Sequence, residues 1–256
     1  MNTRWVVLPG LAETPEEFGR VVSLLPSCEL RLIDPWHTPV TSAPDVLSSA
    51  AGVESPVGLV GHSIGGLAAL RWMLTRPFEV DRLILVDTSL TSETGLRWLY
   101  PGTPADRGIR ALLGFLGRLG VPGLLGPAAR RLLVRVGSVT NRDLLSKATA
   151  RARYGAPGSW LLFWDELASS WALAAEVAAL LEHPPEDLPP TVLLVATGGS
   201  SRFTANRWLA GQRALAAKLS ATVEVLPDSA HLVHLDRPEA IDDLLVRTVH
   251  QQDQVD

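Results

Sequence analysis

Cysteine, lysine and long apolar runs are scarce in this chain of 256 residues. The single cysteine, Cys28, has no partner for an internal disulfide, which suits a reducing compartment. No apolar run is long enough to cross a bilayer, and the short run near the N-terminus does not resemble a signal peptide. We therefore expect a cytoplasmic protein without stable membrane insertion, either a monomer or a homodimer.

The chain also lacks a basic block. It carries 23 lysines and arginines against 27 aspartates and glutamates, a formal net charge of −4. A protein that binds nucleic acid needs a concentrated positive surface, so we expect no nucleic acid as a partner. Hydrophobic residues make up 46% of the chain, which is enough to bury one large core.

Short β-type runs alternate with helical patterns over most of the sequence. Thr14 and Glu17 form a capping box at the start of an apolar stripe that extends to Leu25. Such alternation predicts an α/β fold with a mostly parallel central sheet flanked by helices. The expected strands are residues 5–8, 29–34, 57–60, 81–87, 191–196 and 222–226, and helices are expected over about 204–219 and from about 238.

Residues 88–190 interrupt this alternation. The stretch is helical in pattern, broken by glycine and proline, and rich in tryptophan. We predict a helical cap inserted after the strand that ends at Asp87, with residues 1–87 and 191–250 forming the core. Trp160 and Trp164 are candidates for lining an apolar pocket beneath the cap, although a second helical layer with its own small core explains the pattern equally well.

One stretch of this region, residues 112–119, is amphipathic enough to touch a membrane. The same pattern arises when a helix packs against its neighbours within a cap. We favour packing within the cap.

Residues 61–65, Gly-His-Ser-Ile-Gly, follow an apolar run and precede an apolar helical stretch. This context predicts a nucleophile elbow, in which Ser63 lies on a sharp turn between a strand and a helix. Gly61 and Gly65 leave room for the turn, and the helix N-terminus favours negative charge that develops near Ser63. The alternative is an ordinary glycine turn with a solvated serine.

A histidine suited to act as a base, His231, lies in a polar turn after the last expected strand. That position is at the C-terminal edge of the sheet, where active sites of open parallel sheets lie. His234 follows at a spacing that could suggest a metal, but neither a third ligand nor an acidic cluster is evident, so we expect no metal. His62, inside the elbow, is expected to pack beside the site rather than act as the base.

With Ser63, a carboxylate and His231 in this order, residues 5–249 resemble the α/β-hydrolase family. The turn at residues 230–238 is similar to the family's histidine turn, with alanine in place of the usual glycine before the histidine. The resemblance implies that Ser63 is the nucleophile and that His231 is its general base.

The resemblance also implies an oxyanion hole made of two backbone N–H groups. These belong to Ile64, which follows the nucleophile, and to Leu11 in the loop after the first strand. Relatives commonly carry His-Gly in that loop, whereas this chain has Pro9-Gly10. The donor is backbone, so the change need not abolish it, although the hydrogen bonding of the loop must differ.

The acid is where this chain departs from the commoner pattern of the family. Most relatives place an aspartate after the penultimate strand, but residues 197–202 contain no carboxylate. In some members the acid follows the strand after the elbow helix, which here ends at Asp87. We favour Asp87, because a buried carboxylate orients His231 and stabilises its imidazolium. The other candidates are Ser200, as a weak neutral orienter, and Asp34 and Asp228.

These residues predict a serine hydrolase that cleaves a carboxylic ester or thioester of a hydrophobic small molecule through an acyl-enzyme, without a cofactor. Epoxide hydrolases and haloalkane dehalogenases of the family use an aspartate nucleophile, so Ser63 argues against both. Carbon–carbon bond hydrolases and hydroxynitrile lyases keep the serine and stay open. A non-hydrolytic cyclase, lyase or binding chamber in natural-product biosynthesis also stays open, because the acid and the oxyanion loop depart from the common pattern.

Overall fold

A computed structural model of the chain describes residues 4–24 and 29–252, so that Leu25 and Cys28 lie outside the described residues. Its centre is a parallel sheet of six described strands in the order β2-β1-β3-β4-β5-β6. The predicted α/β class with a parallel sheet is confirmed. The strands are β1 (Arg4–Leu8), β2 (Glu29–Leu32), β3 (Val57–His62), β4 (Val80–Val86), β5 (Thr191–Ala196) and β6 (Thr222–Leu226).

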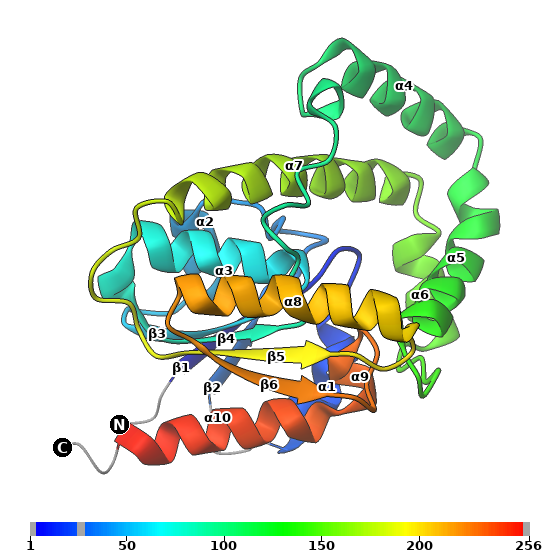
Figure 1. Ribbon diagram of the computed structural model, residues 1–256. Helices are drawn as coiled ribbons and strands as arrows, with labels where there is room; N and C mark the ends of the chain where they lie inside the picture. The colour runs from blue at the N-terminus through cyan, green and yellow to red at the C-terminus, as the bar shows by residue number, and fades with distance from the viewer. Residues whose placement is uncertain (1–3, 25–28, 253–256) are drawn as a thin grey trace.

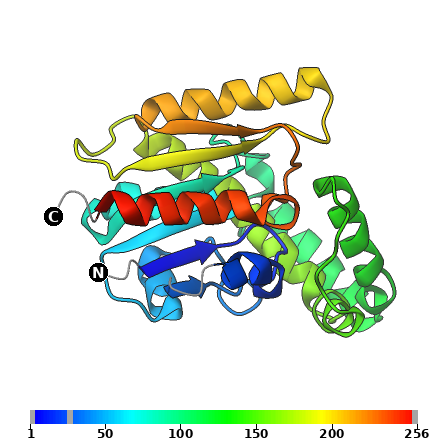
Figure 2. The same cartoon turned by 90° about the horizontal axis from the view of Figure 1, so that it is seen from below.

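Helices cover both faces of this sheet, which is why its strands are apolar on both sides. Buried side chains of α2, α3, α7 and α8 form one core with the sheet, and those of α1 and α10 form a second core on the other face. Figure 2 shows α10 and α1 in front of the sheet. The flanking elements are α1 (Gly19–Leu24), α2 (Pro44–Ala51), α3 (Ile64–Thr75), α8 (Arg202–Lys218), α9 (Val233–Asp236) and α10 (Pro238–Gln252), with short 3-10 turns η1 (Pro15–Phe18), η2 (Pro77–Glu79) and η3 (Arg97–Leu99).

The predicted elements differ from the observed ones mainly at their ends. The helix expected after Thr14 begins as the 3-10 turn η1, where the Glu17 carboxylate accepts the Thr14 N–H at 2.8 Å. The strand expected over residues 29–34 ends at Leu32, although the N–H of Ile33 still donates to the Val7 carbonyl at 3.0 Å.

Four described helices lie between β4 and β5: α4 (Pro104–Arg118), α5 (Val121–Gly137), α6 (Lys147–Tyr154) and α7 (Ser159–Leu180). We call them the inserted helices. α7 lies along α3, whereas α4 and α5 reach away from the sheet (Figure 1). These helices occupy the stretch predicted as a cap, and the division into core and cap stays a prediction.

No single helix of the described residues is long and apolar enough to cross a membrane. α4 and α5 pass that test of length and composition only when taken together, and they are bent by 104° at their junction. Packing against the other inserted helices leaves one face of α4 uncovered, because Leu112, Phe115 and Leu119 are each more than half exposed.

Candidate active site

The backbone of Ser63 is strained at the junction of β3 and α3. Its φ of 53° and ψ of −122° are rare for a residue with a side chain. Hydrogen bonds hold this conformation: the Ser63 N–H donates to the Val86 carbonyl at 3.2 Å, and the Ser63 carbonyl accepts from the N–H groups of Gly66 and Ser89, both at 3.0 Å. The turn therefore has the geometry of a nucleophile elbow.

Both elbow glycines are required by close backbone contacts. A Cβ atom on Gly65 would lie 2.0 Å from the Leu8 carbonyl oxygen, and one on Gly61 would lie 2.6 Å from the Gly65 oxygen. Neither neighbour is the end of a flexible side chain, so no side chain fits without moving backbone.

His231 joins the nucleophile to a carboxylate. Its Nε2 lies 3.1 Å from Ser63 Oγ, and its Nδ1 lies 2.7 Å from Asp87 Oδ2. The other Asp87 oxygen accepts the Ala196 N–H at 3.0 Å and the indole N–H of Trp208 at 2.8 Å. With Nδ1–H donated to a buried carboxylate, the Nε2 lone pair faces the serine hydroxyl, which is the tautomer that a general base needs.

The structure brings together Ser63, His231 and Asp87 but none of the other acid candidates. Ser200 is exposed, and no hydrogen bond joins it to His231 in the described part of the chain. Asp34 and Asp228 each form an ion pair with an arginine.

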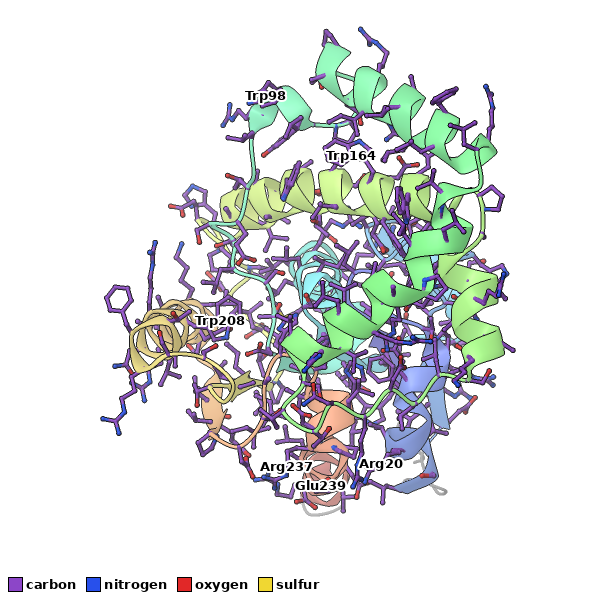
Figure 3. The ribbon with its side chains drawn as sticks, turned by 90° about the vertical axis from the view of Figure 1, so that its right-hand side faces the viewer. Arg20, Trp98, Trp164, Trp208, Arg237 and Glu239 are labelled. Atoms are coloured by element: carbon purple, nitrogen blue, oxygen red, sulfur yellow. The ribbon has the colours of Figure 1, made fainter. Side chains whose placement is uncertain are left out.

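Trp208 was not found by sequence reasoning. It lies on α8, where Figure 3 shows it beside the edge of the sheet. Its indole N–H is one of two donors that fix the Asp87 carboxylate from the side opposite His231.

The two predicted oxyanion donors have no acceptor among the described residues. Within residues 4–24 and 29–252, no hydrogen bond is made by the N–H of Leu11 or by that of Ile64. Ile64 is the first residue of α3, so its N–H is one of the unsatisfied donors of a helix N-terminus. The loop before Leu11 runs beside the nucleophile, because a Cβ atom on Gly10 would lie 3.0 Å from Ser63 Cβ.

A buried ion pair of Glu13 and His62 connects the oxyanion loop to the histidine turn. His62 Nδ1 lies 2.7 Å from Glu13 Oε1, and Glu13 Oε2 accepts the Gly10 N–H at 2.6 Å. On the other side, His62 Nε2 donates to the His231 carbonyl at 2.7 Å. His62 thus packs beside the site, as expected, and Glu13 is the partner that the sequence did not reveal.

Burial and the neighbouring groups act in opposite directions on the pKa values of this pair. Burial alone would raise the pKa of Glu13 and lower that of His62. Burial is the largest single effect, but the attraction within the pair and the hydrogen bonds and charges of neighbouring groups together outweigh it, so the pKa of Glu13 falls below its ordinary value and that of His62 rises above it.

We expect Glu13→Gln to destabilise the protein by about 3 kcal/mol, because it leaves a buried imidazolium without its counterion. The loss of stability should be greatest at pH values between 4.5 and 6.5, which are the ordinary pKa values of Glu13 and His62. The stabilisation by Glu13 disappears as pH falls through its lowered pKa, and that by His62 disappears as pH rises through its raised pKa. Thermal unfolding of wild type and Glu13→Gln at a series of pH values measures this loss of stability, and Glu54→Gln, at an exposed residue, is the control. A stability difference between wild type and Glu13→Gln that does not change with pH would contradict the prediction.

One group of acidic and histidine residues in the described chain is compact enough to consider as a metal site. Ligand atoms of Glu13, His62 and His234 all lie within 4.8 Å of one another. Glu13 and His62 already bind each other, and the ring of His234 is stacked on Phe18 with centroids 4.3 Å apart. A metal would have to displace the ion pair. His231 turns instead toward Asp87 and Ser63, so it does not share a site with His234.

Asp236 fastens the histidine turn to the segment after α5. Its carboxylate accepts the N–H groups of Ala230, Val139 and Thr140, each at 3.0 Å, and the Ser138 hydroxyl at 2.5 Å. Burial raises the pKa of Asp236, but these hydrogen bonds outweigh it and hold the pKa below its ordinary value. The turn that carries the base is therefore attached to the inserted helices.

The two predicted pocket tryptophans lie on α7. Trp164 points toward α4 (Figure 3), where its indole N–H donates to Asp106 at 2.7 Å. Its ring contacts that of Trp171, which also lies on α7. Trp160 is half-buried at the start of α7. The contact of Trp164 joins α7 to α4, and the lining of a substrate pocket by either residue stays a prediction.

A cavity of about 360 Å³ lies between α3 and α7, next to the elbow. It includes Ile64, which follows the nucleophile, and Ser89, whose N–H holds the Ser63 carbonyl. Its other lining residues are Leu67, Glu93, Gly95, Leu167, Ser170 and Trp171.

Comparison with known proteins gives one family and several relatives. A family model described as the alpha/beta hydrolase family matches residues 6–244. The chain is 28% identical over 191 residues to sn-1-specific diacylglycerol lipase ABHD11 from Mus musculus, covering 72% of this chain but only 56% of that protein. It is 26% identical over 259 residues to Lipase LipV from Mycobacterium tuberculosis, covering 93% of this chain and 90% of the lipase.

Solved structures share the fold at low identity. An alpha/beta hydrolase fold protein from Burkholderia ambifaria has a TM-score of 0.68 at 17% identity. The match covers 96% of this chain and 91% of the Burkholderia chain. The haloalkane dehalogenase DbeA-M1 loop variant from Bradyrhizobium elkanii has a TM-score of 0.64 at 17% identity. The match covers 99% of this chain and 90% of the dehalogenase chain. At this identity the similarity shows the fold alone.

Proposed function

This chain belongs to the alpha/beta hydrolase family, and from that premise we propose that it is a serine hydrolase acting on a carboxylic ester or thioester of a hydrophobic small molecule. The family predicted from the sequence is confirmed by the match over residues 6–244. The observation that carries the proposal is the continuous contact from Asp87 through His231 to Ser63.

In the proposed mechanism, Ser63 Oγ attacks the carbonyl carbon while His231 Nε2 takes its proton. The oxyanion is bound by the N–H groups of Leu11 and Ile64, and Asp87 stabilises the imidazolium that forms. His231 then protonates the leaving group, which departs and leaves an acyl group on Ser63. A water molecule, deprotonated by His231, releases the acid and restores the serine.

The contact between Asp87 and His231 bears on the non-hydrolytic alternative. That alternative rests on the absence of the acid from its usual place and on the altered oxyanion loop, and a carboxylate at His231 Nδ1 weakens the first of these reasons. Activity on short p-nitrophenyl esters separates the two: wild type should hydrolyse them and Ser63→Ala should not. Equal rates for both proteins, at the level of buffer, would favour a cyclase, a lyase or a binding chamber.

We further propose that the cavity between α3 and α7 holds the apolar part of the substrate. Leu67, Leu167 and Trp171 supply apolar surface there, and the Glu93 carboxylate disfavours an anionic acyl chain. The mouse relative is by name a diacylglycerol lipase, which is consistent with a hydrophobic ester.

Medium-chain p-nitrophenyl esters are accordingly expected to exceed the acetate in kcat/KM, since each buried methylene contributes up to about 0.8 kcal/mol. Leu167→Trp fills the cavity and should remove this preference while leaving the acetate nearly unchanged. Leu161→Trp is the matched control, because Leu161 lies on the same helix but lines a different cavity. Equal kcat/KM for all chain lengths in wild type would contradict the assignment.

A further inference from the structure

Residues 104–154 concentrate positive charge in an otherwise acidic chain. They contain ten arginines and lysines and only two acidic residues, whereas the whole chain has a net charge of −4. Arg110, Arg130 and Arg153 are neutralised by ion pairs with carboxylates. The other seven are exposed and form no salt bridge with a described residue: Arg107, Arg118, Arg131, Arg135, Arg142, Lys147 and Arg151.

The outer face of α5 combines this charge with exposed apolar side chains. Leu125, Leu132 and Val136 share one helical face, and they are 53%, 61% and 75% exposed. The inner face of the helix is buried. Arg131 and Arg135, one turn apart, lie beside the apolar face rather than opposite it.

α4 repeats the arrangement. Leu112, Phe115 and Leu119 form an exposed apolar stripe, and Arg107 and Arg118 are exposed on its flank. The two helices meet at a bend of 104° and project from the rest of the molecule, as the green helices of Figures 1 and 2 show. We call the exposed outer faces of α4 and α5 the arm surface.

We propose that the arm surface binds the surface of an anionic lipid membrane. Leucines flanked by arginines match a bilayer interface, because the apolar side chains enter the acyl boundary while the guanidinium groups meet lipid phosphates. A second copy of this chain fits less well, since a symmetric contact would bring like charges together. Nucleic acid offers phosphates but no apolar phase for the leucines. The inference is independent of the proposed ester hydrolysis.

Flotation with phospholipid vesicles tests the proposal. Wild type should float with vesicles of phosphatidylcholine and phosphatidylglycerol, less with phosphatidylcholine alone, and less again at high salt. Arg131→Gln and Arg135→Gln should each weaken binding to the anionic vesicles by about fivefold. Leu132→Ser with Val136→Ser should weaken binding to a similar or greater extent at every salt concentration. All four side chains are exposed, so unchanged thermal unfolding should accompany the loss.

Controls from other surfaces make the outcome specific. Phe78 is 91% exposed before β4, and Arg213 is exposed on α8; Phe78→Ser and Arg213→Gln should float like wild type. Ser63→Ala should also bind fully, which separates this proposal from the hydrolase proposal. Absence of flotation, equal losses in the control variants, or a dimer that Leu132→Ser dissociates would overturn the assignment.

Discussion

Asp87→Asn is expected to lower kcat by up to about 10⁴-fold, the loss that the corresponding change causes in serine proteases. An asparagine keeps the shape, and its carbonyl oxygen can still accept from Ala196 and Trp208. Its NH₂ group then faces His231 Nδ1 and donates to it, so that the proton of the imidazole moves to Nε2. A ring with its proton on Nε2 has no lone pair for the Ser63 hydroxyl. Steady-state kinetics on a p-nitrophenyl ester measures the effect.

Ser200→Ala is the matched control for this prediction. Removing at most one neutral hydrogen bond, about 1 kcal/mol, should cost no more than roughly tenfold in kcat. Near wild-type activity of Asp87→Asn, with a large loss in Ser200→Ala, would show that Asp87 is not the acid and that the neutral hydroxyl of Ser200 orients His231 instead. Both proteins should unfold at temperatures close to that of wild type if the effect is one of proton position.

A fluorophosphonate probe is expected to label Ser63 and no other serine. Among the serines that the structure describes, only Ser63 combines a strained turn, a helix N-terminus and contact with His231. His231→Ala should nearly abolish labelling and lower kcat by up to about 10⁶-fold, as loss of the base does in a serine protease. The His231 side chain is 42% exposed, so its removal should leave the fold intact.

Mass spectrometry of the labelled protein locates the adduct. Circular dichroism of His231→Ala shows whether the fold persists. An adduct on another serine, or unreduced labelling of the folded variant, would be incompatible with the proposed roles of Ser63 and His231.

The parts of the site that sequence reasoning found are those with a local or topological signature. Ser63 is marked by its glycines and by the strand and helix on either side. Asp87 could be inferred from the family resemblance, because it ends the strand after the elbow helix, where some members hold the acid, and β4 does lie beside β3. Parallel strands bring their C-terminal ends to one edge, so such a residue lies near the nucleophile.

The parts that were missed depend on contacts between distant segments. In the sequence, Trp208 occupies an ordinary apolar position of a helix. Its indole N–H nevertheless donates to the carboxylate of Asp87, 121 residues away. Glu13 has no motif, and its pairing with His62 depends on how the first loop folds over the elbow. Hydrophobic periodicity likewise identified α4 as amphipathic without showing which apolar face another helix would cover.

The hydrogen bonds of Asp236 have a consequence for protein engineering. Exchange of helical insertions between relatives is an obvious route to altered substrate range, but here the insertion is not an independent module. The Asp236 carboxylate is shared between Ala230 in the histidine turn and Ser138, Val139 and Thr140 after α5. A chimera that loses the Ser138 hydroxyl or changes the backbone path of residues 138–140 would break hydrogen bonds to the turn that positions His231, so the graft boundaries should lie outside that segment.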